Sequence, residues 1–193
     1  MFTEDYLMRI INQAIAALMT AIGLKKAGKY SEAHQAIQQA IEQLTTLPAN
    51  LVDQMDDGSI LSMLAGQGQL EVGRVAILAD IYLEQGDILF KMDKVVQGSF
   101  AYARALRLIL EVVLAEDANM TTENIGKVEA LTQRLEGNTL PIETQLALSD
   151  YYQRLLQKDD QNLSAAGTSR KHVSQALANL QDHLDPTQNT SGD

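Results

Sequence analysis

The side chains that most often do chemistry are scattered along this chain. None of the three histidines, His34, His172 and His183, has a second histidine or a preceding glutamate at the helical spacing that puts two metal ligands on one face. The chain has no cysteine, which excludes disulfides, thiolate metal sites and cysteine nucleophiles. We therefore expect no metal site and no cofactor.

Carboxylates that are neighbours in the sequence are the other candidates for chemistry. General acid–base catalysis needs two carboxyl groups that face each other in a pocket with separated pKa values. An acidic chain forms neighbouring pairs by chance, so we expect these groups to be solvated and predict no catalytic residue. The pairs are Asp56 with Asp57, Asp80 with Glu84, and Asp159 with Asp160.

The negative net charge of the chain argues against two classes of partner, nucleic acids and anionic membranes. The chain has 15 Lys and Arg against 25 Asp and Glu, a formal charge of −10, which repels phosphate backbones and anionic lipid. The N-terminus is acidic where a secretory signal needs basic residues. The apolar run from Ala14 to Leu24 is too short to cross a bilayer. We expect a cytoplasmic protein that binds neither nucleic acid nor membranes.

Apolar residues recur at helical spacing through most of the chain, and no segment alternates like a strand. This pattern predicts an all-α fold with one domain over residues 1–184 and a disordered tail over 185–193. The loop between helices after Lys158 is expected to be polar and irregular. The expected helices cover about residues 3–26, the stretch from the Gly28 turn to the segment 45–48, one or two short pieces within 49–69, a long helix from about 70 to the bend near 91–93, then 95–113, 122–135, 141–158 and a last helix around 173–184.

A short motif around Gly28 predicts a tight helical hairpin. Tyr30 follows the glycine, and the small residues Ala33 and Ala40 allow a second helix to lie close to the first. This motif resembles the turn of a tetratricopeptide repeat. A second, taller unit with its bend near Lys91-Met92-Asp93 departs from the regular repeat length. The resemblance implies antiparallel helical hairpins stacked in a short right-handed array.

The chain also resembles a family of bacterial proteins of unknown function. The shared motifs are Met1-Phe2, Asp5-Tyr6 and Met8-Arg9 at the start, Gly28-Lys-Tyr30, Gly86-Asp87, and Leu140-Pro141 with Glu143-Thr144. The resemblance extends to about residue 155, beyond which the turn expected after Tyr152 is replaced by a polar stretch. It implies a fold and no activity.

The first helix of each hairpin would line a concave groove. The carboxylate clamp that binds acidic C-terminal peptides in some tetratricopeptide proteins is absent, because its positions hold Leu18, Ile22, Ile77, Glu143 and Ala147. The groove has mixed charge, which favours a partner with some basic character. The residues expected to line it are Ile22, Lys25, Lys26, Asp80, Leu83, Glu84, Asp150, Gln153 and Arg154.

These features favour a non-enzymatic module of the tetratricopeptide type that binds a protein or a peptide. The alternative is a structural protein that mainly self-associates, for example as a homodimer, because the first helix has an unusually wide apolar stripe. An enzyme without a recognisable motif is the third interpretation.

Overall fold

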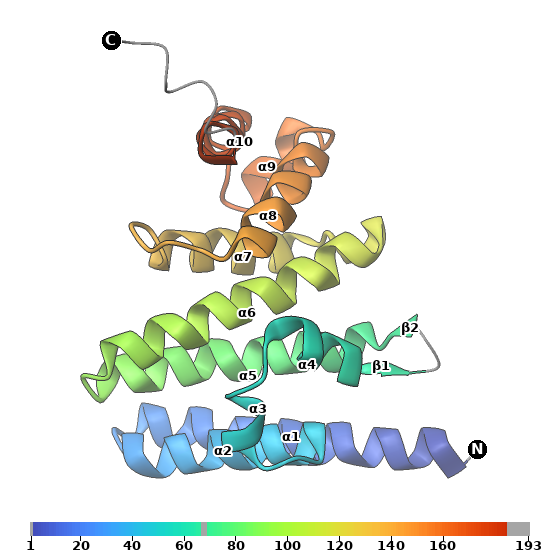
Figure 1. The fold of residues 1–193 in the computed structure, drawn as a ribbon, viewed down its shortest axis with the longest axis vertical. Coiled ribbons are helices and arrows are strands. Elements are labelled where there is room, and N and C mark those ends of the chain that lie inside the picture. Colours follow the sequence, from blue (N-terminus) through green and yellow to red (C-terminus); the bar gives the residue numbers. More distant parts are fainter. Residues whose placement is uncertain (1, 67–68, 185–193) are drawn as a thin grey trace. The chain divides into compact units, whose positions relative to one another are not determined.

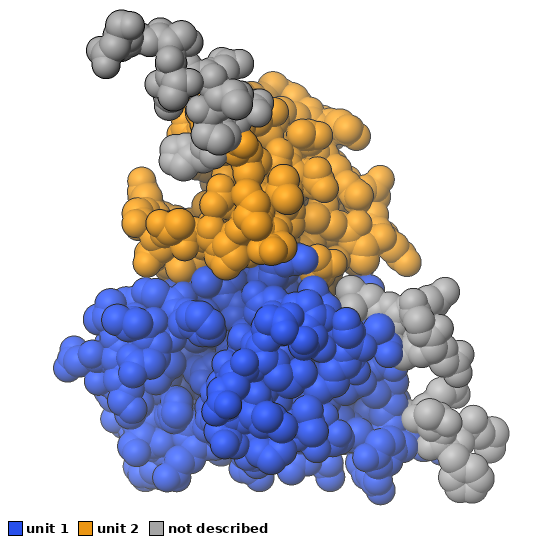
Figure 2. Space-filling view, in the orientation of Figure 1, with its two compact units in different colours: residues 1–108 blue, residues 109–193 orange. Residues whose placement is uncertain are grey.

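The structure is a computed structural model that describes residues 2–66 and 69–184 (Figure 1). The chain divides into two compact units, residues 1–108 and residues 109–193 (Figure 2). Apart from two strands of two residues each, the regular elements in these ranges are helices, so the predicted all-α fold class is confirmed. One domain over residues 1–184 stays a prediction, and the expected disordered tail lies outside the described residues.

The first unit holds most of the long helices. Its elements are α1 (Phe2–Lys26), α2 (Tyr30–Thr45), α3 (Ala49–Val52), α4 (Asp57–Met63), β1 (Ala65–Gly66), β2 (Gln69–Leu70), α5 (Val72–Lys91) and the larger part of α6 (Val95–Ala115). The second unit contains the end of α6, the 3-10 helix η1 (Asp117–Asn119), α7 (Thr122–Arg134), α8 (Ile142–Leu155), α9 (Asp160–Ala165) and α10 (Arg170–Leu184).

The motif around Gly28 forms the predicted hairpin of α1 and α2. Gly28 has a φ of 74°, and the N–H of Lys29 donates to the carbonyl of Leu24 at 3.0 Å, so the end of α1 is closed by a left-handed cap. Ala33 and Ala40 have no exposed surface. Both α1 and α2 also contact α5, which places this hairpin against the next one.

The second hairpin is taller than the first, as its spacing predicts. Helix α5 continues through Gly86 to Lys91, and the chain bends at Asp93, whose φ is 59°. Helices α5 and α6 approach closely where each has a glycine. A Cβ on Gly86 would overlap the Tyr102 ring, and a Cβ on Gly98 would lie 2.5 Å from Phe90 Cδ2.

Two segments differ from the prediction. The expected irregular loop after Lys158 is wrong, because Asp159 caps the short helix α9 by accepting from the N–H of Asn162 at 2.8 Å. Aspartate is unfavourable within a helix and favourable just before one, so its presence indicated a helix start as well as a loop. The β1–β2 hairpin, with Ala65 opposite Leu70, was not predicted because two residues are too few to show an alternating pattern.

Helix α1 has the predicted extent, but its apolar stretch is longer than the run from Ala14 to Leu24. By length and composition alone, residues 5–26 could cross a membrane. Core helices of soluble proteins and signal sequences share these properties, so this is a weak indication. In the first unit, α1 packs against α2 and α5.

The glycines give a direct test of the α5–α6 contact. We expect Gly86→Ala to lower the free energy of unfolding by about 1–3 kcal/mol, because the Tyr102 ring must move to admit the new methyl group. Gly126→Ala in α7 is the matched control, since no atom lies within 4 Å of its Cβ position. This control should gain up to about 1 kcal/mol from helix propensity. The free energies of unfolding are measured by chemical denaturation. An equal increase for Gly86→Ala and Gly126→Ala would contradict the close contact between α5 and α6.

Candidate functional site

A cluster of charges joins the end of α1 to α5. Lys25, in the last turn of α1, donates to the carboxylate of Asp87 at 2.9 Å and also pairs with Glu84. Partial burial alone would lower the pKa of Lys25, but its bonds to these two carboxylates raise the pKa above the ordinary value. Lys25 is therefore held as a cation and serves as a structural link between two helices.

The cluster extends to α6 through a tyrosine. The hydroxyl of Tyr102 donates to the second oxygen of Asp87 at 2.6 Å. The Tyr102 ring stacks on Phe90, with 5.2 Å between ring centroids. Asp87 thus accepts from α1 and α6 at the same time, and the glycines at the α5–α6 contact leave room for the two rings.

A cavity of about 320 Å³ opens beside this cluster. Its volume is at the lower end of the range of ligand pockets in proteins. The side chains around it are aromatic or charged: Lys25, Lys26, Tyr30, Asp87, Phe90, Lys91 and Tyr102. Three lysines, Lys25, Lys26 and Lys91, stand against two carboxylates, Asp87 and the adjacent Glu84, so the surroundings of the cavity have a net charge of +1. A chain with a net charge of −10 therefore has a locally basic, aromatic cavity.

The structure brings together part of the predicted groove. Lys25 and Glu84 form an ion pair, and Lys26 lines the cavity. Ile22 on α1 and Asp80 and Leu83 on α5 are half-buried and do not line it. The Glu84 carboxylate, one of the predicted acidic groups of the groove, is engaged by Lys25 within the protein, which weakens the reason to expect a basic partner.

The other three predicted groove residues lie on α8, in the second unit. Asp150 and Gln153 are exposed. The guanidinium of Arg154 donates to the carbonyl of Leu114 at 3.0 Å and lies 3.7 Å from the Asp117 carboxylate. Arg154 thus ties α8 to the end of α6 within this unit.

Of the seven cavity residues the predicted groove contains only Lys25 and Lys26. The five that it misses are Tyr30, Asp87, Phe90, Lys91 and Tyr102. The sequence does contain a signal for Asp87 and Lys91. Asp87 follows the predicted groove residue Glu84 by three residues and precedes Lys91 by four, a spacing that places these charged residues on one helical face. The motif Gly86-Asp87 was noted only as a family resemblance. Phe90 carried no signal beyond its apolar character.

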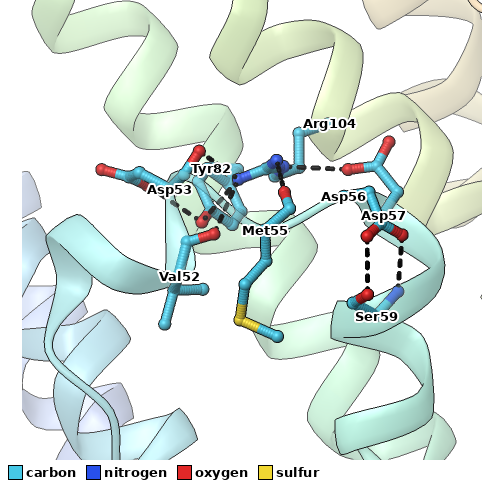
Figure 3. A network of polar contacts seen from close by, with 8 residues as sticks. All are labelled: Val52, Asp53, Met55, Asp56, Asp57, Ser59, Tyr82 and Arg104. Carbon is cyan, nitrogen blue, oxygen red and sulfur yellow. Dashed lines mark hydrogen bonds and ion pairs between the residues drawn. The ribbon is translucent and has the colours of Figure 1, made fainter.

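The second missed feature is a buried arginine. Arg104 on α6 has only 4% of its side chain exposed, and it donates to the carbonyl oxygens of Met55 at 2.6 Å and Val52 at 3.2 Å (Figure 3). Its Nε donates to the Asp57 carboxylate at 2.9 Å. Its guanidinium also lies over the Tyr82 ring, 5.3 Å from the centroid. A buried cation with this many acceptors is a structural anchor.

The second unit has its own largely buried carboxylate, Glu129 on α7, with 14% of its side chain exposed. Its carboxylate accepts from the Tyr151 hydroxyl at 3.0 Å and from the Thr168 hydroxyl at 3.4 Å, and lies 3.2 Å from Nε2 of His172. Burial raises the pKa of Glu129 above its ordinary value, although these partners oppose the shift. In the part of the chain that the structure describes, no three histidine or carboxylate side chains gather as metal ligands.

Comparison with known proteins gives a family and no activity. The chain belongs to a family of unknown function (DUF6483), whose model matches residues 1–185. No curated protein and no solved structure matches the chain. The predicted membership of a family of unknown function is therefore confirmed.

The Arg104 anchor predicts a large effect from a change that keeps the charge. We expect Arg104→Lys to lower the free energy of unfolding by about 2–4 kcal/mol, because one ammonium cannot satisfy acceptors on several sides. Arg9→Lys, at an exposed position on α1, is the control and should change it by less than about 0.5 kcal/mol. A loss at position 104 no larger than at position 9 would show that the guanidinium geometry is unimportant.

The raised pKa of Glu129 predicts a pH dependence of stability. The folded state holds this proton more tightly than the unfolded chain, so the group favours folding below about pH 4.3. That contribution is lost as the pH rises through the folded-state pKa. Glu129→Gln keeps an acceptor for Tyr151 but does not titrate. As the pH rises from about 4.3 through the folded-state pKa of Glu129, the free energy of unfolding of the wild type should therefore fall relative to that of the variant.

Chemical denaturation at a series of pH values measures the difference between the two proteins. His172→Asn is the control, because it leaves Glu129 in place. The free energy of unfolding of this variant should change with pH in the same direction as that of the wild type. Parallel pH profiles for the wild type and Glu129→Gln would contradict the assignment.

Proposed function

We propose that this chain is a non-enzymatic module of the tetratricopeptide type that binds a protein or peptide segment in the cavity beside Lys25. The observation that carries the proposal is the cavity itself: aromatic walls, two exposed lysines, and a position at the contact of two helical hairpins. Contacts between helices of neighbouring repeats are where helical-repeat proteins present their binding surfaces.

The packing of the first unit supports the tetratricopeptide type. The left-handed glycine at the α1–α2 turn, the fully buried Ala33 and Ala40, and the close α5–α6 approach are the features that such hairpins require. The longer second hairpin and the short helices α3 and α4 make this an irregular relative of the repeat. A right-handed stacking of the hairpins is part of the proposal.

The chemistry of the cavity argues against catalysis there. A lysine acts as a nucleophile or base when its pKa is lowered. The pKa of Lys25 is raised instead, and both neighbouring carboxylates are engaged by it. The groups in the cavity are thus arranged to hold a ligand.

The side chains also define the ligand that fits. The rings of Tyr30, Phe90 and Tyr102 suit an apolar or aromatic side chain, which the cavity is large enough to accept. Lys26 and Lys91 suit an acidic residue next to it. We therefore propose a segment with an apolar residue flanked by Asp or Glu. This replaces the partially basic partner expected from the sequence.

Selection of peptides from a random library on the immobilised full chain tests the proposal. We expect enrichment of apolar-acidic peptides, and binding measured by fluorescence anisotropy should weaken about tenfold for Lys26→Glu with Lys91→Glu, since two ion pairs are lost. Lys171→Glu with Lys158→Glu changes the net charge equally and lies in the second unit, so it should change affinity less than about twofold. Failure to enrich any peptide, or equal loss in both double variants, would reject the cavity as the site.

A further inference from the structure

Helix α1 leaves an apolar face uncovered in the first unit. Met8, Ile15 and Met19 keep 54%, 40% and 60% of their surface exposed. Ile11 and Ile22, at the edge of the same face, are half-buried. At 100° per residue these five side chains lie within about 40° of a line through Ile15 along the helix. We call these five residues the α1 stripe.

The α1 stripe is symmetric about Ile15. Ile11 and Met19 lie four residues on either side of it, and Met8 and Ile22 lie seven residues on either side. A face with this symmetry is complementary to itself when two copies run in opposite directions, because every apolar side chain then meets another at the same level. Two-fold interfaces between identical chains require this kind of self-complementary surface.

The charges at the ends of α1 favour the same arrangement. Asp5 lies near the start of the helix and Lys26 at its end, and both are exposed. When two copies of α1 cross antiparallel at Ile15, Asp5 of one copy lies within one residue, about 1.5 Å, of the level of Lys26 of the other, on the same side of the pair. A parallel pair would instead place like charges together, which is unfavourable.

We propose that the α1 stripe is a dimer interface whose occupant is the same stripe of a second copy, antiparallel and centred on Ile15. The five residues of the α1 stripe lie outside the cavity lining, so the apolar contact does not depend on the cavity function. Lys26 is the one residue that belongs both to the cavity and to the charge pair of the dimer. The stripe is narrow compared with interfaces that form stable dimers, so the association is weak, with a dissociation constant in the micromolar range.

Light scattering and sedimentation of the full chain test the association itself. At about 100 µM we expect a dimer, which dissociates on dilution. Met19→Glu should weaken dimerisation at least about tenfold, because two-fold symmetry buries the new charge twice. Gln13→Glu, at an exposed position on the opposite face, is the control and should leave it unchanged. A monomer at every concentration, or equal effects of the two changes, would overturn the proposal.

The absence of natural cysteine allows a test of the geometry. In an antiparallel pair Ile15 meets itself, so Ile15→Cys should form a disulfide-linked dimer under mild oxidation. Met8→Cys or Ile22→Cys alone should not, because equivalent positions are then about 21 Å apart, but a mixture of the two proteins should cross-link. Cross-linking of Met8→Cys with itself would indicate a parallel pair, and equally rapid cross-linking of Gln13→Cys would indicate random collision. Either result rejects the antiparallel interface.

Two further measurements separate the rival occupants. Asp5→Lys alone should weaken the dimer a few-fold, and adding Lys26→Glu to the same chain should restore it, since each pair then has opposite charges again. Flotation with phosphatidylcholine vesicles tests lipid as the occupant. We expect no binding, and vesicle binding that Met19→Glu abolishes in a monomeric protein would assign the stripe to a membrane instead.

Discussion

The buried guanidinium of Arg104 is the constraint on which the first unit depends. A cation with almost no exposed surface is tolerated only when its N–H groups find acceptors. Here the acceptors are the carbonyl of Val52 at the end of α3, the carbonyl of Met55 in the turn that follows, the carboxylate of Asp57, and the hydroxyl of Tyr82 on α5. Segments far apart in the sequence are thereby held at one point, which explains why a stretch with only short helices takes a defined path between α2 and α5.

The same helix, α6, organises the neighbouring cavity by a different means. Along α5 and α6, small residues alternate with rings, so that Gly86 accepts the face of Tyr102 and Gly98 accepts Phe90. The stacked rings bring the Tyr102 hydroxyl to Asp87, and Asp87 in turn holds Lys25. The close packing of α5 against α6 thus positions Asp87, which in turn holds Lys25 of α1 at the edge of the cavity. Lys25 and Asp87 are therefore engaged within the protein, and Lys26 and Lys91 are the exposed charged residues of the cavity.

The sequence predicted the helices well and the site only in part. Helical periodicity and the Gly28 turn located α1, α2, α5 and α6, because in long amphipathic helices apolar residues recur at helical spacing over many turns. The bend at Asp93 followed from the excess length of the second hairpin. Arg104 could not be found, since a charged residue in an apolar helix shows nothing of the carbonyl groups that will surround it. The pairing of Lys25 with Glu84 likewise depends on how α1 lies against α5, which periodicity does not encode.

Helix α1 contributes to three surfaces of the first unit. Its buried side, with Ala14, Ala21 and Leu18, packs in the first unit, its last turn supplies the lysines of the cavity, and the α1 stripe faces solvent. A core helix needs only one apolar face. Packing within the chain does not explain the second one, the α1 stripe, and an exposed apolar surface lowers solubility. The symmetric spacing about Ile15, with opposite charges at the two ends, gives that second face a physical reason: it matches its own copy turned end for end.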